Sequence, residues 1–164
     1  MSKQLNKLNA KIFHIKDFTQ ILKEWKSVGN KIVFTNGCFD LIHLGHLEIL
    51  ARSADLGDKL IVGINSDKSI KRIKGKSRPI IEEDSRAKQL AAIEFVDAVI
   101  LFNEDTPHNL ISFINPDILT KGGDYKKHDV IGNELMNKKA GEVVIIPLTQ
   151  GYSTTSILEK IKNE

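Results

Sequence analysis

Two histidines lie three residues apart in the stretch HLGH, where His43 and His46 flank Gly45. This stretch follows the apolar run KIVFTNG, which begins at Lys31, and it opens an amphipathic run, so a strand is expected to pass into a helix here. A helix N-terminus presents unpaired backbone N–H groups and the positive end of the helix dipole, which suits a phosphate. Residues three apart on a helix are neighbours. The spacing therefore predicts a phosphate-binding site with two imidazole donors on one side.

Other chemistries fit the histidine pair less well. A zinc site would need more ligands, and the sequence has one cysteine, Cys38, and no second histidine pair. The fingerprints GxGxxG and GxxxxGK[ST] are absent, which argues against a dinucleotide-binding turn and a P-loop. The surroundings of Cys38 indicate a packing or backbone role for this residue and not a covalent one. Gly37 and Gly45 carry no Cβ, so a ligand can approach the backbone closely there.

Five short runs rich in Val and Ile are expected to form strands, and amphipathic runs separate them. The strand runs begin at Lys31, Lys59, Asp97, Asp117 and Glu142. They nearly lack period-two alternation, which is typical of parallel strands buried on both faces. Helices are expected over 44–57, 82–95, 106–116, 128–141 and 155–164. The pattern predicts an α/β fold, a doubly wound Rossmann-like parallel sheet of five strands with helices on both faces.

Two segments stand outside this alternation. Residues 17–29 are amphipathic and predict a further helix with Ile21 and Trp25 inward, so 1–30 is interpreted as an N-terminal extension with one helix and 31–164 as the main domain. The connection after the second strand has no clear helical pattern, and a long basic loop in a compact domain is often functional. Its cations are Lys68, Lys71, Arg72, Lys74, Lys76 and Arg78.

The bulk composition excludes several classes of protein. A chain of 164 residues suffices for one domain with a real core. The net charge of +3 is small, and the few aromatics (6%) are not interleaved with the basic loop, so a nucleic-acid-binding surface is not expected. No run approaches the roughly 18 apolar residues of a membrane span, and the first residues have no apolar leader. With a single cysteine, the chain is expected to be cytoplasmic and not membrane-bound.

The stretch GCFDLIHLGH resembles the signature of the HxGH nucleotidyltransferase superfamily, in its cytidylyltransferase-like branch. The segments KGxxRP, KGGDY and STT follow in the family's order and spacing, so the resemblance runs from about Lys31 to the C-terminus. Within the branch, the chain is most similar to the adenylyltransferases of ADP-heptose synthesis, which serve lipopolysaccharide production. Two departures weaken a cytidylyltransferase interpretation: Tyr152 stands where those enzymes usually have Ile, and Leu148 stands where the glycerol-phosphate enzymes carry Arg.

The resemblance implies transfer of AMP from ATP to a sugar 1-phosphate, D-glycero-β-D-manno-heptose 1-phosphate, to give ADP-heptose and pyrophosphate. It implies Mg²⁺ held mainly through phosphates, no metal ligands from the protein, and a homodimer. The attacking phosphate has a second pKa near ~6, so such a site needs no strong general base. It needs in-line positioning and donors for the developing charge. Two alternatives stay open: a cytidylyltransferase for glycerol 3-phosphate or a related phosphorylated alcohol, and a non-catalytic nucleotide-binding sensor.

The resemblance also assigns roles by position. The implied catalytic residues are His43, His46, Lys74 and Arg86. The implied nucleotide-binding residues are Thr35, Asn36, Gly37, Phe39, Asp40, Gly45, Gly123, Asp124, Gly151, Ser153, Thr154 and Thr155. For Asp40, capping of the following turn is an equally good interpretation.

Overall fold

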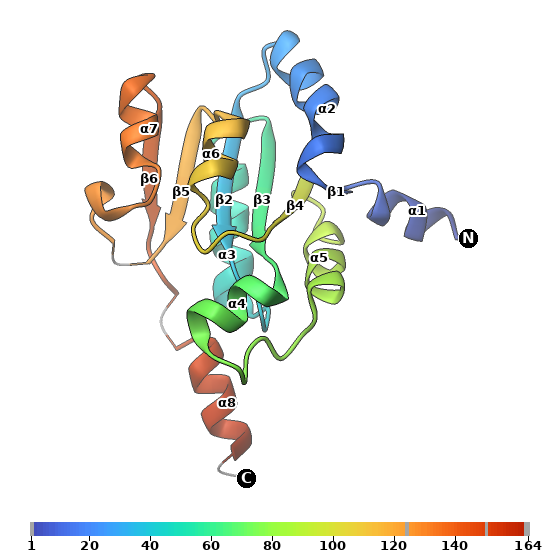
Figure 1. Ribbon diagram of the computed structural model, residues 1–164, viewed down its shortest axis with the longest axis vertical. Coiled ribbons are helices and arrows are strands. Elements are labelled where there is room, and N and C mark those ends of the chain that lie inside the picture. The colour runs from blue at the N-terminus through green and yellow to red at the C-terminus, as the bar shows by residue number, and fades with distance from the viewer. Residues whose placement is uncertain (1, 124, 150, 163–164) are drawn as a thin grey trace.

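The computed structural model describes residues 2–123, 125–149 and 151–162, and its centre is one parallel sheet (Figure 1). The strand order is β1-β4-β3-β2-β5-β6, and every neighbouring pair is parallel. The strands are β1 (Ile12–Phe13), β2 (Ile32–Gly37), β3 (Lys59–Asn65), β4 (Ala98–Phe102), β5 (Ile118–Gly122) and β6 (Glu142–Ile146). The predicted α/β class and parallel sheet are confirmed.

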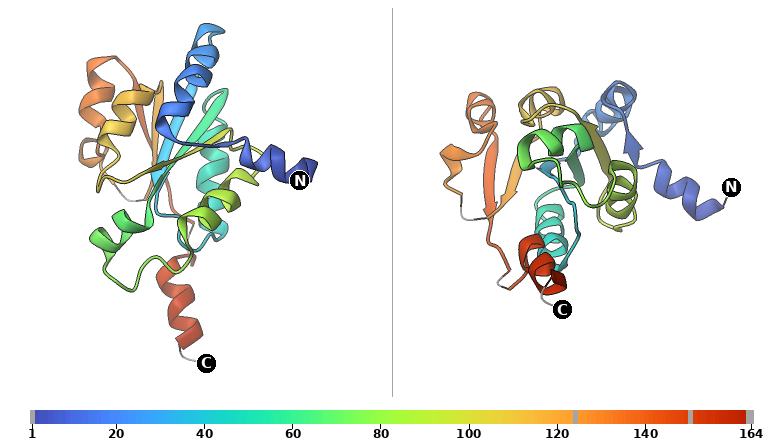
Figure 2. Two further views of the ribbon diagram at one scale, coloured as in Figure 1. Left: turned by 45° about the vertical axis from the view of Figure 1, so that its right-hand side comes forward. Right: turned by 60° about the horizontal axis from the view of Figure 1, so that its bottom comes forward.

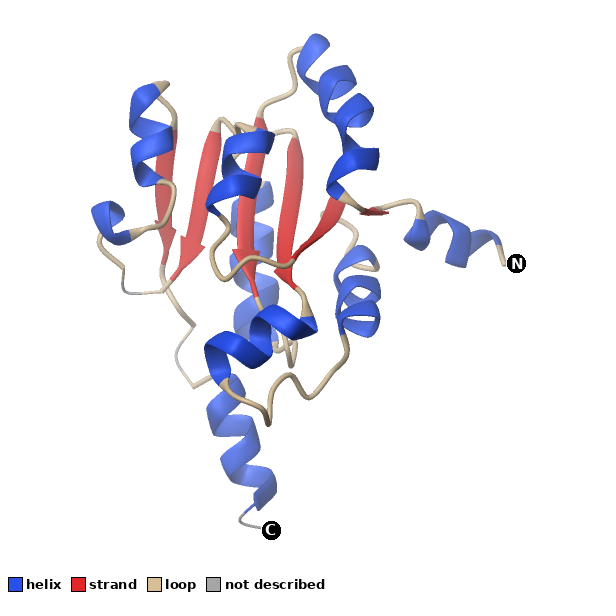
Figure 3. Ribbon diagram, viewed as in Figure 1, coloured by secondary structure: helices blue, strands red, loops and turns tan. Residues whose placement is uncertain are grey.

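Helices cover both faces of the sheet (Figures 2 and 3). They are α1 (Lys3–Asn9), α2 (Ile15–Ser27), α3 (Leu44–Ala54), α4 (Asp67–Lys74), α5 (Glu83–Ala91), α6 (His108–Ile114), α7 (Asn133–Lys138) and α8 (Thr154–Lys162), with a 3₁₀ turn η1 (Lys127–Asp129). None of the helices in the described part of the chain is long and apolar enough to cross a membrane.

The side chains of the strands alternate between two apolar cores. In β2, Ile32 and Phe34 pack with α2, α6 and α7 on one face, whereas Val33 packs with α3 and α5 on the other. All three side chains are fully buried. Because both faces of the strand are covered, its sequence reads as a continuous apolar run.

The N-terminal segment differs from the expected single helix. It forms two helices, α1 and α2, and contributes β1, which pairs with β4 at the edge of the sheet and raises the strand number from the predicted five to six. Ile21 and Trp25 of α2 are half-buried against the core, as expected. The strand was missed because two residues are too few to show a periodicity.

The basic connection after β3 also differs from the expected loop, because its first half is the helix α4. Ser66 caps this helix by accepting a hydrogen bond from the backbone N–H of Ser69 (3.1 Å), and Ile70 is fully buried beneath it. The helix ends at Gly75, whose φ is +94°. The many exposed cations concealed a short amphipathic pattern with one deeply buried apolar residue.

The order in which successive strands are added to the sheet changes direction between β2 and β5. Beginning at β2 it builds outward through β3 and β4, and it then returns to the other side of β2 to form β5 and β6. Ligands of doubly wound sheets bind outside the carboxyl ends of strands at such a switch point. The carboxyl ends of β2 and β5 are Asn36–Gly37 and Lys121–Gly122, and they lie at the lower end of the sheet in Figure 1.

Candidate active site at the switch point

A cavity of about 290 Å³ lies at this switch point and collects most of the residues that the sequence singled out. It is lined from β2 and the turn after it, from the first turn of α3, from the end of α4, from β5 and from the start of α8. Eleven of the sequence-predicted site residues line it: Thr35, Asn36, Gly37, Phe39, Asp40, His43, Gly45, His46, Lys74, Ser153 and Thr154.

The two histidines stand at the N-terminus of α3 with their rings stacked. His43 is the N-cap residue, His46 lies one turn into the helix, and the ring centroids are 3.9 Å apart with planes inclined by 31°. Within the described part of the chain, Nδ1 of each ring is buried and has no hydrogen-bond partner. A buried polar atom without a partner costs about 1–3 kcal/mol, so the pair is a site that a ligand would stabilise.

Two neighbouring residues fix the positions of the rings. A Cβ on Gly45 would lie 3.1 Å from Cε1 of His43, so a glycine is needed where the first imidazole folds back over the helix. Phe39 is buried with a left-handed backbone (φ +47°), a conformation that is costly for a residue with a side chain. Its ring lies 5.3 Å from that of His46. The strained turn therefore positions the wall against which His46 packs.

Both imidazoles are held in the neutral state. Burial, the neighbouring His43 and the cation of Lys74 lower the pKa of His46 to about 4. Burial also lowers the pKa of His43. At neutral pH the rings therefore act as hydrogen-bonding groups and not as fixed positive charges. The positive charge of the cavity comes from lysine, arginine and the helix N-termini.

Lys74 is the last residue of α4 and brings a cation to the cavity from the side opposite α8. No hydrogen bond or ion pair joins its ammonium group to another described residue. The remaining lysines of this helix differ, because Lys68 and Lys71 line a separate surface hollow beside Glu82 and Glu83. Of the basic residues on α4, the structure therefore brings only Lys74 to the histidines.

Asp40 connects the turn after β2 to the chain that follows α4. One carboxylate oxygen accepts from Arg78 (2.5 Å), and the other accepts from the backbone N–H groups of Ile80 (2.7 Å) and Ile81 (3.0 Å). Asp40 is almost fully buried. Of its two interpretations, contact with its own following turn is wrong, because the carboxylate binds a segment about 40 residues further along the chain. Arg78 itself lines the cavity, although the predicted set omitted it.

Arg86 lies behind the cavity and not in its wall. Its side chain is fully buried, and its guanidinium donates to the carbonyls of Ile81 (2.9 Å), Cys38 (2.6 Å) and Asn65 (2.9 Å) and to Asp67 (2.8 Å). These hydrogen bonds leave the guanidinium of Arg86 with little capacity to bind a substrate. Arg86, which the resemblance implied among the catalytic residues, therefore has a positioning geometry, in which it joins the ends of β2 and β3 to α5.

The predicted C-terminal residues divide into two groups. Ser153 and Thr154 line the cavity, so the first turn of α8 adds a second helix N-terminus to it. Gly123, Gly151 and Thr155 lie outside the lining. Asp124 falls outside the described residues.

Lys121 is a lining residue that the sequence-based assignment missed. It sits one residue before the end of β5, and its ammonium donates to the carbonyl of Asn36 (3.1 Å) and to its side-chain oxygen (3.4 Å). Burial lowers its pKa, and the cation of Lys74 lowers it further. The available signal was that Lys121 is the first residue of the KGGDY segment and lies at the carboxyl end of a predicted strand.

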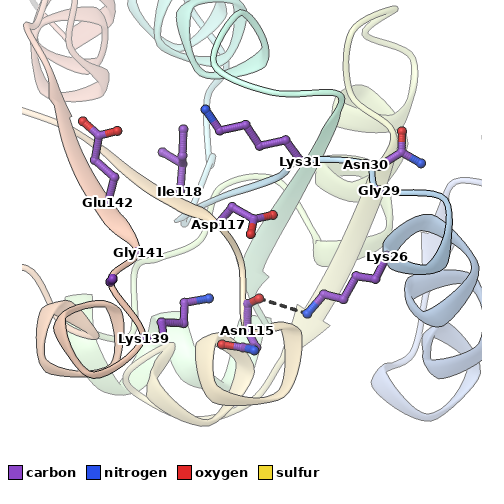
Figure 4. Close-up of a pocket in the computed structure, with 11 residues that line it drawn as sticks. Lys26, Gly29, Asn30, Lys31, Asn115, Asp117, Ile118, Lys139, Gly141 and Glu142 are labelled. Carbon is purple, nitrogen blue, oxygen red and sulfur yellow. Dashed lines mark hydrogen bonds between the residues drawn. The ribbon is translucent and has the colours of Figure 1, made fainter.

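A larger groove of about 730 Å³ lies at the opposite end of the sheet, beside the amino ends of β2, β5 and β6 (Figure 4). Lys26, Lys31 and Lys139 line it, together with Asp117 and Glu142. None of the sequence-predicted site residues contributes to it. Its size alone does not make it the functional site, because the ammonium groups of Lys26 and Lys139 already donate to carbonyl oxygens of the protein.

The chain is similar to known proteins in sequence and in structure. A bifunctional protein HldE from Nitrobacter winogradskyi is 51% identical over 144 residues, which are 88% of this chain and 30% of that protein. The chain thus spans about a third of the length of the curated relatives it matches. The crystal structure of a lipopolysaccharide core biosynthesis protein from Thermoplasma volcanium is 34% identical, with a TM-score of 0.60 over 76% of this chain and 100% of that one.

A more distant structure shares the fold. Pantoate-beta-alanine ligase from Francisella tularensis, solved with an ATP analogue and beta-alanine, is 16% identical with a TM-score of 0.63 over 92% of this chain and 76% of that one. The family model described as cytidylyltransferase-like matches residues 34–160, which include both histidines, Lys74 and the start of α8. Because this match covers most of the chain, the protein belongs to the cytidylyltransferase-like family and is a nucleotidyltransferase.

Proposed function

We propose that this protein is an adenylyltransferase that transfers AMP from ATP to D-glycero-β-D-manno-heptose 1-phosphate and releases pyrophosphate. The observation that carries the proposal is the stacked histidine pair, with two buried nitrogens lacking partners, at a helix N-terminus that faces Lys74 and the start of α8. A polyphosphate would supply acceptors to all of these groups at once.

The chemistry is a displacement at phosphorus. An oxygen of the sugar phosphate, already ionised at neutral pH, attacks the α-phosphorus of ATP and forms a new P–O bond. The bond from the α-phosphorus to the oxygen that bridges to the β-phosphate breaks, and pyrophosphate leaves with that electron pair. The protein has to align the two phosphates and stabilise the charge that develops between them.

The lining residues fit this task. Neutral His43 and His46 donate to phosphate oxygens, and the N-termini of α3 and α8 add their backbone N–H groups. Lys74 supplies a mobile cation that no described residue neutralises. Asp40 and Arg86 touch no substrate in this proposal, and they hold the turn that carries the pair.

Magnesium fits the site through the phosphates. Asp40, which lines the cavity, has both carboxylate oxygens occupied by Arg78 and two backbone amides, so it has little capacity for a cation. Bound to the phosphate oxygens of ATP, Mg²⁺ would neutralise part of their charge.

The choice of base and acceptor rests on the relatives. The relatives include a bifunctional HldE and a lipopolysaccharide core biosynthesis protein. Leu148 and Tyr152, the two positions at which this chain departs from the cytidylyltransferase pattern, both line the cavity, which supports a nucleotide other than CTP. A homodimer remains a prediction, which sedimentation of the purified chain would check.

The test is pyrophosphate release from ATP and from CTP with a panel of acceptors. We expect turnover with ATP and the heptose 1-phosphate, and little with CTP or glycerol 3-phosphate. Preference for CTP with a polyol phosphate would replace the proposal with the cytidylyltransferase alternative. A rise in melting temperature with ATP, without turnover on any acceptor, would instead indicate a nucleotide sensor.

A further inference from the structure

A second cavity, of about 540 Å³, adjoins the first at the carboxyl ends of β2 and β5. The two cavities share a wall made of Asn36, Gly37, Cys38, His46, Lys74, Lys121 and Gly122. Molecules bound in the two cavities would meet at this wall. A displacement at phosphorus requires such a meeting, because the attacking oxygen and the α-phosphorus must lie in line and in contact.

The walls that are not shared differ in chemistry. The first cavity has His43 and the start of α8, which suit phosphates. The second has the carboxylates of Asp105 and Asp129 and the exposed ring of Tyr125. Carboxylates repel phosphate and accept hydrogen bonds from hydroxyl groups, whereas the face of an aromatic ring can pack on apolar C–H groups. The far side of the second cavity therefore suits an uncharged polyol.

Gly123 allows the tyrosine to take this position. Its φ is +131°, and a Cβ there would lie 2.9 Å from a ring carbon of Tyr125. Asp129 is exposed, and its contact is the imidazole of His128 at 3.4 Å, whereas Asp105 already binds Arg72 at 2.7 Å. Of the two carboxylates, Asp129 has the greater capacity for a hydroxyl group.

Lys121 lies at the shared wall without a counter-ion. Among the described residues, its ammonium donates only to the neutral carbonyl and side-chain oxygens of Asn36. After burial, the influences on its pKa come from the shared wall, where Cys38 raises it and the cation of Lys74 lowers it, and no carboxylate belongs to that wall. A desolvated ammonium without an anion is unfavourable unless a ligand supplies the charge. Burial, which lowers the pKa of Lys121, is consistent with this missing anion.

We propose that the second cavity is the acceptor site, and that Lys121 anchors the phosphate of a phosphorylated sugar whose hydroxyl groups face Asp129 and Tyr125. This inference rests on the proposed function, because it places ATP in the first cavity. Held by Lys121, the acceptor phosphate lies at the wall that it shares with His46 and Lys74, beside the α-phosphate that it attacks.

Replacing Lys121 with a residue that has no amine tests whether it binds the acceptor phosphate. For Lys121→Met we expect the KM for the sugar 1-phosphate to rise about tenfold to a hundredfold, the effect of losing one charge-assisted hydrogen bond. The KM for ATP should stay within about twofold of the wild-type value. Lys121→Arg, which keeps the positive charge, should have a KM for the sugar 1-phosphate much closer to that of wild type. Lys127→Met is the matched control, since Lys127 is exposed and outside both cavities. An unchanged acceptor KM, or a larger rise in the KM for ATP, would overturn the assignment.

A pH profile separates contact from a structural role. The wild-type acceptor KM should rise at alkaline pH as Lys121 loses its proton, whereas the profile of Lys121→Arg should be flatter. The other titratable groups around this wall are Lys74, His46, Cys38, Asp105, Tyr125 and Asp129. Both profiles are measured in a Cys38→Ser background, so that the thiol on the shared wall is absent. Identical profiles for the two proteins would contradict the anchor.

A binding measurement keeps this inference distinct from the proposed reaction. Heptose 1-phosphate is titrated calorimetrically into wild type and Lys121→Met, each saturated with an ATP analogue whose α,β-bridge is a methylene. Weaker binding to the variant supports the anchor even if wild type shows no turnover, an outcome that refutes only the proposed reaction. Equal binding to both proteins, or no binding to wild type, refutes the anchor. Circular dichroism and urea unfolding of the variant confirm that it is folded.

Discussion

The two ends of the sheet both gather lysines, but their ammonium groups have different partners. At the amino end, Lys26 donates to the carbonyl of Asn115 (2.9 Å; Figure 4). Lys26 also donates to the carbonyl of Ile114 (2.6 Å), and Lys139 donates to the carbonyl of Pro116. These carbonyls belong to the C-terminal end of α6 and the residues after it, where helices leave acceptors unsatisfied. Lys26 and Lys139 therefore supply hydrogen-bond donors to carbonyls that the end of α6 leaves unsatisfied.

At the carboxyl end, Lys121 donates to Asn36, but Lys74 and Nδ1 of the two histidines lack such partners among the described residues. Within the described part of the chain, Lys74 has no hydrogen bond or ion pair, and the buried Nδ1 atoms of His43 and His46 have no acceptor or donor opposite them. Burial lowers the pKa of lysines at both ends, namely Lys26 and Lys139 at one and Lys121 at the other. Positive charge and burial therefore do not distinguish a ligand site, whereas unsatisfied donors do.

The largest effect that this comparison predicts is on turnover at the carboxyl end. His46→Ala removes one preorganised donor, and we expect kcat to fall by about 10²–10³, or roughly 3–4 kcal/mol of transition-state stabilisation. Pyrophosphate release under saturating substrates measures it. The control is His108→Ala, which removes an exposed imidazole that pairs with Glu134. Near-normal turnover in His46→Ala would show that the unpartnered rings do not act on phosphate.

The second prediction sets Lys74 against another lysine of the same helix. Lys74→Ala should lower kcat/KM by about tenfold to a hundredfold, because it removes a charge-assisted contact to phosphate. Lys68→Ala, whose side chain is exposed and outside the cavity, should have no measurable effect. Steady-state kinetics on both variants tests the difference. Similar losses in the two would indicate a general electrostatic effect of α4.

At the amino end the expected effect is on stability. Lys26→Met leaves two carbonyls at the end of α6 without their donor, so the free energy of unfolding should fall by about 1–2 kcal/mol. Urea denaturation measures this loss, and kcat should be unchanged. A loss of turnover with no loss of stability would reverse the roles assigned to the two ends.

The last prediction concerns pH. The pKa of His46 is about 4 in the folded protein and about 6.5 in an unfolded chain. Between these values the unfolded state binds the extra proton, so the free energy of unfolding should decrease as pH falls from about 6.5 toward 4. The contribution of His46 is complete above pH ~6.5. Urea denaturation at several pH values should show a shallower dependence in His46→Gln, and an unchanged dependence would contradict the burial of this ring.

Much of the architecture follows from local patterns. The parallel strands were predictable because strands covered on both faces are apolar throughout, and α3, α5 and α6 were predictable from their amphipathic spacing. The 3₁₀ turn and short α7 replaced one longer helix expected over 128–141, because Gly132 has a positive φ (+93°) that interrupts it. Local patterns show which residues are helical, but a tertiary contact decides where a short helix stops.

The site was predictable where a role follows from residue type and spacing. His43, His46 and Lys74 line one cavity, as the resemblance implied. Lys121 was missed, and the positioning geometry of Arg86 was not predictable, because both depend on partners distant in sequence. Arg86 binds Cys38 and Asn65, and Lys121 binds Asn36. Sequence spacing does not reveal whether a cation is already satisfied inside the fold.

The three hydrogen bonds that Asp40 accepts limit how far Lys74 can move. Because Arg78, Ile80 and Ile81 are fastened to the turn that carries the histidines, only residues 75–77 separate Lys74 from a fixed point. The four residue steps from Lys74 to Arg78 span at most about 14 Å when extended, so this attachment limits how far Lys74 can move from the imidazoles. Within this limited range, the ammonium group of Lys74 can stay in contact with pyrophosphate as it leaves and then return to the site. Inserting glycines into 75–77 would widen the range while leaving every contacting side chain in place.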